Sequence, residues 1–131
     1  MSSISKKALL IDDSEMQRAL LRDILHKMNF EVFEAENGRL GLDKIIECAQ
    51  DFNIVFCDVN MPVLSGLEML EQYRAYCQEN PHIKALPIIM LTSEADRESI
   101  VRGKAAGAAG WLIKPAKQEH IAKLLNVFAA A

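Results

Sequence analysis

The sequence predicts an α/β fold built on a parallel sheet, and three observations lead to this prediction. Short apolar runs of strand length recur along the 131 residues. Segments with helical patterns lie between these runs, so strand and helix alternate. Polar clusters stand at the downstream ends of most runs. Strictly alternating strands and helices pack as a parallel sheet with right-handed crossovers and helices on both faces.

Five runs are predicted as strands because they are short and rich in branched or aromatic residues. They cover residues 8–11, 32–33, 54–57, 88–91 and 111–113. Pro87 stands just before the fourth run, where the backbone donor that proline lacks is not needed.

Five helices are predicted between and after these strands. Apolar residues recur every four positions from residue 16 to residue 28, which indicates one broad apolar face, and Ser14 can cap the start. Residues 121–128 show the i, i+3, i+4, i+7 spacing of a last helix. Glycine, proline, asparagine or serine bound three less regular helices at about residues 38–48, 65–77 and 95–105.

Length and composition indicate one globular domain. Half of the residues are apolar and a quarter are charged. We expect a single domain over residues 1–131, with its core at about 6–128 and no second domain in this chain. No apolar stretch approaches the roughly 18 residues of a membrane span, and the apolar run that ends at Asp12 is too short to be expected as a signal peptide. We therefore expect a cytoplasmic protein without membrane insertion.

Charge, cysteine and histidine usage exclude several other classes. The net charge is −3 and no basic stripe appears, which argues against direct nucleic-acid binding. The three cysteines form no Cys-x-x-Cys pair and have no histidine at metal-ligand spacing, so we expect reduced, structural thiols. Cys57 is predicted to be a small buried hydrophobe, and the scattered histidines are expected at the surface.

Four polar clusters follow the first, third, fourth and fifth strand runs: Asp12-Asp13, Asp58 with Asn60, Thr92-Ser93 and Lys114-Pro115. The carboxyl ends of parallel strands meet at one edge, so the clusters should share one crevice. Two carboxylates about 4 Å apart repel by roughly 1 kcal/mol in water and about 4 kcal/mol at an effective dielectric near 20. A cation would relieve this repulsion. Hard oxygen ligands with room for a phosphate oxygen favour Mg²⁺.

The clusters suggest separate roles in phosphoryl transfer. Asp58 is the candidate nucleophile, because a carboxylate at a strand end can take a phosphoryl group covalently. Lys114 can pair with Asp58 before the reaction and with phosphoryl oxygens afterwards, and Thr92 supplies a hydroxyl donor. Three of the clusters also have an ordinary interpretation: a helix cap for Asp12-Asp13 and for Thr92-Ser93, and a turn for Lys114-Pro115. Those interpretations do not explain why the clusters converge.

Two segments resemble the response-regulator receiver domain. Residues 58–66, Asp-Val-Asn-Met-Pro-Val-Leu-Ser-Gly, are similar to the phosphoacceptor strand and loop of that family, and residues 107–115 are similar to its last strand. The likeness extends from about residue 6 to residue 128. It implies a five-stranded doubly wound sheet in the order 2-1-3-4-5.

The resemblance also implies a chemistry for these residues. Asp58 would be phosphorylated by a histidine kinase or a phosphotransfer protein, and Thr92 and Lys114 would contact the phosphoryl group. The chain would catalyse only its own phosphorylation and dephosphorylation and would not otherwise be an enzyme. Mg²⁺ would be bound by Asp13, Asp58, the Asn60 carbonyl and, through a water, Asp12.

A switch and an output surface follow from the same resemblance. Phosphorylation would draw Thr92 inward, and the aromatic residue of the last strand would follow; this residue is Trp111, where most receivers carry Tyr or Phe. Asn60 and Glu94 would line the path of the attacking water and so influence the lifetime of the phosphoryl group. A downstream protein would bind the surface of helix four, strand five and helix five, at about residues 97–128.

Other functions stay open at this point. The chain could carry phosphate within a phosphorelay, or act as a docking module that has lost phosphorylation. A haloacid dehalogenase phosphatase would need Asp-x-Asp, but Asn60 replaces the second acid. A nucleotide-binding module would need a glycine-rich turn where Asp12-Asp13 stands. Gly103, Gly107 and Gly110 are expected instead to end the fourth helix.

Overall fold

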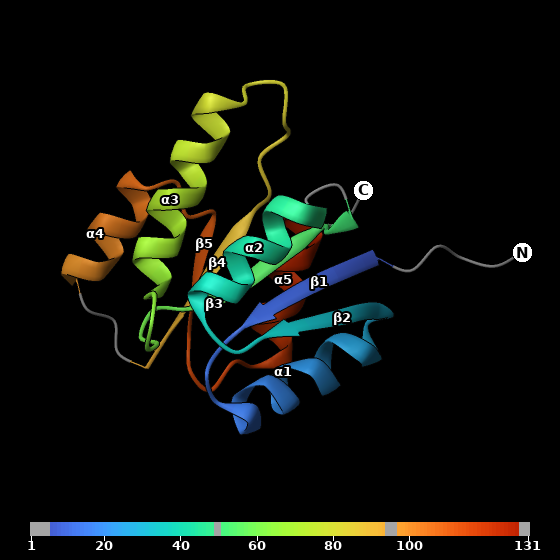
Figure 1. Cartoon of the computed structure of the whole chain (residues 1–131). Coiled ribbons are helices and arrows are strands. Elements are labelled where there is room, and N and C mark those ends of the chain that lie inside the picture. The colour runs from blue at the N-terminus through green and yellow to red at the C-terminus, as the bar shows by residue number, and fades with distance from the viewer. Residues whose placement is uncertain (1–5, 49–50, 94–96, 129–131) are drawn as a thin grey trace, which may run out of the picture.

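The computed structural model describes residues 6–48, 51–93 and 97–128, in which five strands alternate with five helices (Figure 1). The elements are β1 (Lys6–Ile11), α1 (Glu15–Lys27), β2 (Phe30–Ala35), α2 (Gly38–Cys48), β3 (Ile54–Asp58), α3 (Gly66–Glu79), β4 (Ile88–Thr92), α4 (Arg97–Ala105), β5 (Gly110–Ile113) and α5 (Gln118–Phe128). All strand pairs are parallel, in the order β2-β1-β3-β4-β5. The predicted fold class and strand order are confirmed.

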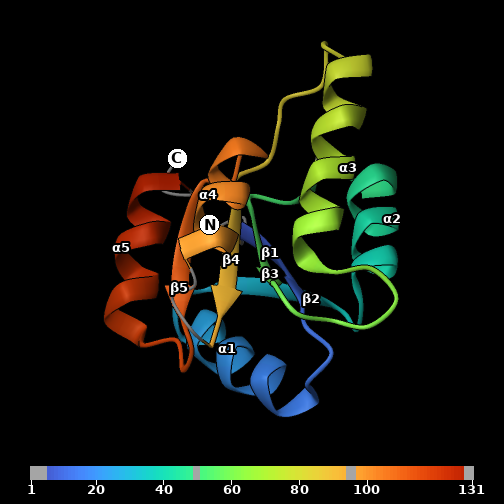
Figure 2. The same ribbon diagram turned by 90° about the vertical axis from the view of Figure 1, so that its left-hand side faces the viewer.

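Helices cover both faces of the sheet: α1 and α5 pack on one face, and α2, α3 and α4 lie on the other (Figure 2). Successive residues of β1 therefore enter two different cores. Ala8 and Leu10 pack with α1 and α5, whereas Leu9 and Ile11 pack with α2 and α3. Burial on both faces explains why the central strands are uninterrupted apolar runs in the sequence.

The second strand is longer than the sequence predicted. It covers Phe30–Ala35, whereas only residues 32–33 were expected. Two glutamates interrupt the apolar run: Glu31 is exposed, and Glu34 is half-buried and ion-paired with α1. Because β2 lies at the edge of the sheet, it pairs with β1 alone and its burial is incomplete.

Gly103 does not end the fourth helix, and that prediction was wrong. It lies buried inside α4, where an added Cβ would come within 2.3 Å of Cζ2 of Trp111. The helix ends at Ala105, and Gly107, with φ of 96°, follows it. Gly103 is therefore needed for space, because the helix crosses directly over the indole ring. Gly110 also does not end α4 but begins β5.

Minor predictions agree with the structure in the described ranges. Cys57 is fully buried, and burial raises the pKa of its thiol, so the thiol stays neutral. All three histidines are exposed. Among the described residues, no helix has both the length and the apolar character needed to cross a bilayer.

Candidate functional site

Two buried carboxylates stand where the central strands end. Asp12 directly follows β1 and Asp58 is the last residue of β3, the neighbouring strand. Only 3% of Asp12 and 7% of Asp58 is exposed. Between β1 and β3 the order of the sheet reverses direction, and ligands of such folds bind in the crevice outside this point. The sheet therefore places both carboxylates at its expected ligand-binding edge.

Lys114, which directly follows the edge strand β5, forms ion pairs with both carboxylates. Its Nζ lies 3.0 Å from Oδ2 of Asp12 and 3.2 Å from Oδ2 of Asp58. The backbone amide of Lys114 donates to the Thr92 carbonyl at 2.8 Å, which fixes the chain after β5 to the end of β4. The ion pair expected between Lys114 and Asp58 is present, and Asp12 shares the same ammonium.

The electrostatics of the site favour a further cation. Burial raises the pKa of Asp58, and the Asp12 carboxylate raises it further; the Lys114 ammonium and a hydrogen bond from the Asn60 backbone offset only part of this effect. Burial lowers the pKa of Lys114, but the two carboxylates outweigh it and hold the pKa above its ordinary value. One ammonium thus serves two buried carboxylates, and excess negative charge is left at the edge.

Asp13 completes a set of oxygen ligands. It is exposed in the bend after Asp12. Carboxylate oxygens of Asp12, Asp13 and Asp58 all lie within 4.8 Å of one another. Such oxygens are the ligands of hard divalent cations such as Mg²⁺. The residues present therefore fit the cation that the sequence predicted.

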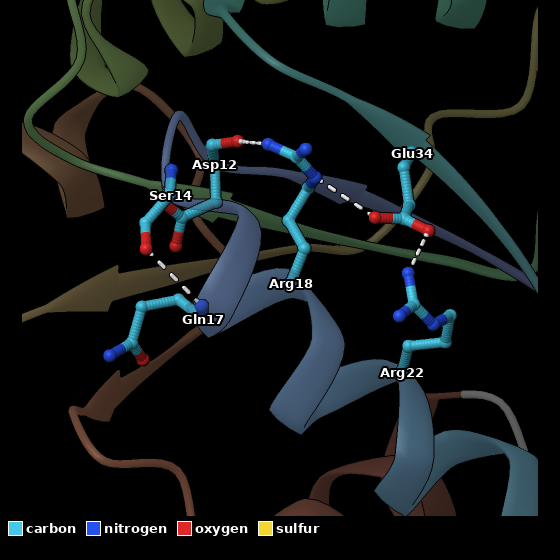
Figure 3. Close-up of polar contacts among 6 residues, drawn as sticks. All are labelled: Asp12, Ser14, Gln17, Arg18, Arg22 and Glu34. Atoms are coloured by element: carbon cyan, nitrogen blue, oxygen red, sulfur yellow. Dashed lines mark hydrogen bonds and ion pairs between the residues drawn. The ribbon is translucent and has the colours of Figure 1, made fainter.

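The turn between β1 and α1 shows that neither Asp12 nor Asp13 is the N-cap of the helix. Ser14 is the N-cap of α1, and its hydroxyl accepts a hydrogen bond from the Gln17 amide at 3.2 Å (Figure 3). Asp12 supports this cap from outside the helix, since its Oδ1 accepts from the Ser14 amide at 2.9 Å. The helix start is thus capped by a serine, which leaves Asp13 exposed beside the crevice.

The loop after Asp58 is held close to the edge of the sheet where Asp12 and Asp58 lie. The Val59 amide donates to the Leu91 carbonyl at 2.9 Å, and the Gly66 amide donates to the Val59 carbonyl at 2.9 Å. A Cβ on Gly66 would lie 2.0 Å from the Asp58 carbonyl oxygen, so only glycine lets α3 begin there. Within the loop, Val63 has φ of 73°, an uncommon backbone for a β-branched residue.

Thr92 and Trp111 lie on the face of the sheet that α2, α3 and α4 cover. Thr92 is buried at the end of β4, and the two-residue period of a strand places it on the face of Met90. Trp111 pairs in register with Met90, packs on the same core, and buries an indole Nε1 that has no hydrogen-bond partner among the described residues. The predicted switch residues therefore share one face of the sheet, and Trp111 lies under α4 at Gly103.

Two further site predictions have different outcomes. Asn60 is exposed in the loop after Asp58. Glu94 lies outside the described residues. Sequence reasoning did not single out Arg18, which donates a hydrogen bond to the Asp12 carbonyl. Its partners lie on other elements, so no local motif marks it.

Comparison with known proteins agrees with this geometry. The family model described as the response regulator receiver domain matches residues 8–126. The chemotaxis protein CheY-3 of Vibrio cholerae is 34% identical over 110 residues, which cover 83% of this chain and 80% of that protein.

Solved structures give the same result. The chemotaxis protein CheY4 of Vibrio cholerae superposes with a TM-score of 0.82 at 36% identity, covering 95% of this chain and 99% of that chain. The receiver domain of Ssk1 from Saccharomyces cerevisiae reaches 0.88 at 21% identity, covering 99% and 92%, a likeness of fold alone. The chain belongs to the response regulator receiver domain family of two-component signalling and is a CheY-like member of it.

Proposed function

We propose that Asp58 accepts a phosphoryl group from a histidine kinase or a phosphotransfer protein, and that Mg²⁺ assists the transfer. The observation that carries this proposal is the buried Asp58 carboxylate, ion-paired with Lys114 and next to Asp12 in a receiver domain. Receiver domains are signalling proteins rather than classical enzymes. Here the only reactions proposed are phosphorylation and dephosphorylation of Asp58 itself, in a receiver core of about residues 6–128.

The transfer needs one nucleophile and compensation of charge. A carboxylate oxygen of Asp58 attacks the phosphorus of a phosphohistidine, the phosphorus–nitrogen bond breaks, and the imidazole leaves with the bonding electrons. The product is an acyl phosphate on Asp58. Lys114 then exchanges its pairing with the Asp58 carboxylate for pairing with the phosphoryl oxygens.

Several groups of the site serve the proposed metal and the bound phosphoryl group. Asp13, Asp58 and the Asn60 carbonyl would hold Mg²⁺, and Asp12 would contact it through a water. When bound, the ion would neutralise charge on the phosphoryl oxygens. Thr92 would donate its hydroxyl to the phosphoryl group. Asn60 and Glu94 would set how fast water removes it.

An exposed apolar surface beside the site supports docking of a phosphodonor protein. On α1, Met16 is 72% exposed and Leu20 is 52% exposed. Leu20 lines a small cavity together with Asp12, Lys114 and Ala116, so this surface reaches the Asp12–Lys114 ion pair. The Ssk1 receiver domain, which has the same fold, was co-crystallised with the histidine phosphotransfer protein Ypd1. A partner of this class would bring its phosphohistidine to Asp58.

The output would leave through α4, β5 and α5. A phosphoryl group adds about −1.5 to −2 units of charge, enough to move a neighbouring two-state element. Thr92 would follow that charge and Trp111 would follow Thr92, which changes the support of α4 at Gly103. Val101 and Ile113 are 61% and 56% exposed on this surface and offer apolar contacts to a downstream protein.

Intact mass spectrometry tests the proposal. The wild type incubated with Mg²⁺ and acetyl phosphate should gain one phosphoryl group, and Asp58→Asn should gain none. Trp111 is the only tryptophan, so its emission should change with phosphorylation if it is the switch residue. Equal labelling of both proteins, or of neither, would contradict the phosphoacceptor role. An emission spectrum that stays unchanged on verified phosphorylation would exclude Trp111 as the switch residue but would leave the phosphoacceptor role of Asp58 intact.

A further inference from the structure

Arg18 links the carboxylate-bearing turn to the edge strand. From α1, its Nη1 donates to the backbone carbonyl of Asp12, and its Nε donates to Oε1 of Glu34 on β2 at 2.9 Å (Figure 3). Only 14% of the Arg18 side chain is exposed. One guanidinium therefore connects three parts of the fold: α1, the turn after β1, and β2.

The atom that Arg18 contacts decides how Asp13 is presented. The other polar atoms of Asp12 have partners of their own: its amide donates to the Ala35 carbonyl at 3.1 Å, and its carboxylate oxygens contact Ser14 and Lys114. The Asp12 carbonyl belongs to the planar peptide group that leads to Asp13. A hydrogen bond to this oxygen therefore fixes the orientation of the peptide from which the Asp13 carboxylate extends.

We propose that Arg18 is a positioning residue for the metal ligand Asp13, acting through the Asp12–Asp13 peptide. This inference rests on the proposed function, in which Asp13 binds Mg²⁺ directly. Glu34 orients the guanidinium by accepting a hydrogen bond from its Nε–H group, so that Nη1 points at the Asp12 carbonyl. Partners that orient metal ligands from outside the ligand set commonly change metal affinity about 10- to 100-fold when they are removed.

Charge and geometry make opposite predictions for Arg18. The guanidinium is a cation near a cation site, so removing its charge alone would strengthen the binding of a divalent metal. Removing the hydrogen bond to the Asp12 carbonyl would instead weaken the binding, because Asp13 would no longer be held in place. A role limited to fold stability would leave the affinity of the folded protein unchanged. The sign of the change therefore separates these three explanations.

The experiment measures Mn²⁺ binding by electron paramagnetic resonance of the free ion, with Mg²⁺ competition, in protein without phosphodonor. Arg18→Met is compared with Arg22→Met, which loses the same charge. Arg22 contacts the other oxygen of Glu34, at 2.6 Å, but its described contacts do not include Asp12. We expect Arg18→Met to bind roughly tenfold more weakly, at the low end of the range for such partners. Arg22→Met should bind within about twofold of the wild type, because screening by water weakens the effect of a partly exposed charge.

Arg18→Lys is the second variant and distinguishes geometry from charge. Lysine keeps the cation but cannot place two N–H groups of a planar fork on two acceptors. We expect its affinity to stay as low as that of Arg18→Met. In metal-free protein, the ¹⁵N–¹H signal of the Asp13 amide should also shift in both Arg18 variants and stay in place in Arg22→Met.

The outcomes separate this inference from the function on which it rests. Unchanged or tighter binding by Arg18→Met, or full rescue by Arg18→Lys, overturns the positioning role while the metal site stands. If the wild type does not bind Mn²⁺, the proposed metal site fails and the role of Arg18 fails with it. Should Arg18→Met not fold, Arg18→Lys and the Asp13 signal decide the question alone.

Discussion

Two groups of charged residues at the same end of the sheet are built in opposite ways. In the carboxylate cluster, Asp12 and Asp58 share the single ammonium of Lys114. In the arginine network, Arg18 and Arg22 share the single carboxylate of Glu34. Burial raises the pKa of Asp58, and the cluster does not fully offset it. Burial also raises the pKa of Glu34, but hydrogen bonds from the two arginines outweigh burial and hold that pKa below its ordinary value.

The difference shows which charges stabilise the fold. Glu34 loses its proton more readily in the folded chain than in the unfolded chain, so its charge stabilises the protein at neutral pH. Asp58 loses its proton less readily in the folded chain than in the unfolded chain, so its charge destabilises the metal-free protein. Proteins retain such unfavourable groups where function requires them. The carboxylate cluster is thus suited to binding a cation, and the arginine network is suited to holding that cluster in place.

Lys114→Met should produce the largest effect, because it removes the only cation seen between the two buried carboxylates in the described part of the chain. Stripping one partner from a buried ion pair costs about 3–5 kcal/mol, and partial contact of Lys114 with solvent lowers this to about 2–3 kcal/mol. Urea unfolding at neutral pH without metal measures the loss. The deficit should shrink in acid, as Asp58 becomes protonated, and also when Mg²⁺ is added.

Lys123→Met is the matched control, since Lys123 is an exposed lysine on α5. Its stability should equal that of the wild type within error. A deficit of the same size in both variants, or one that is independent of pH, would show that the loss does not come from the unpaired charges of Asp12 and Asp58.

Glu34→Gln should destabilise the protein by about 1–1.5 kcal/mol, because both arginines lose a charged acceptor that is partly open to screening by water. The folded pKa of Glu34 lies below its ordinary value of 4.5. Its contribution is therefore complete above that value and is lost as the pH falls through the folded pKa. Unfolding free energies of the two proteins should converge in acid. A stability difference between Glu34→Gln and the wild type that persists below both the folded and the unfolded pKa of Glu34 would show that the carboxylate charge is not the cause.

The carboxylate cluster could be predicted from the sequence because its residues are tied to strand ends. Asp12, Asp58 and Lys114 each follow an apolar run, and parallel topology brings those ends together. The ion pairs between them then follow from charge alone. This part of the site needs no long-range information beyond the order of the strands.

The arginine network could not be predicted in this way. Arg18 and Glu34 are 16 residues apart on a helix and an edge strand, and their contact depends on how α1 packs. The prediction for Gly103 failed for a similar reason, since local signals assign glycine to helix ends whereas here the indole of Trp111 requires it. Glu34 also concealed the length of β2, because a charged residue in an edge strand interrupts the apolar run.

Asp58→Asn should have the smallest effect of the three and the opposite sign. Because the folded pKa of Asp58 is raised above its ordinary value of 3.8, the folded state holds the proton more tightly, and wild-type stability falls as the pH rises through this range. The asparagine removes that loss, so the metal-free variant should be more stable than the wild type by about 1 kcal/mol at neutral pH and equal to it in acid. Parallel urea titrations against pH measure this gain, which grows as the pH rises above 3.8, whereas the deficit of Glu34→Gln is already complete above 4.5. Added Mg²⁺ should reverse the ranking, because binding stabilises only the chain that keeps its ligands. A metal-free Asp58→Asn variant that is less stable than the wild type at neutral pH would show that both charge clusters stabilise the fold in the same way.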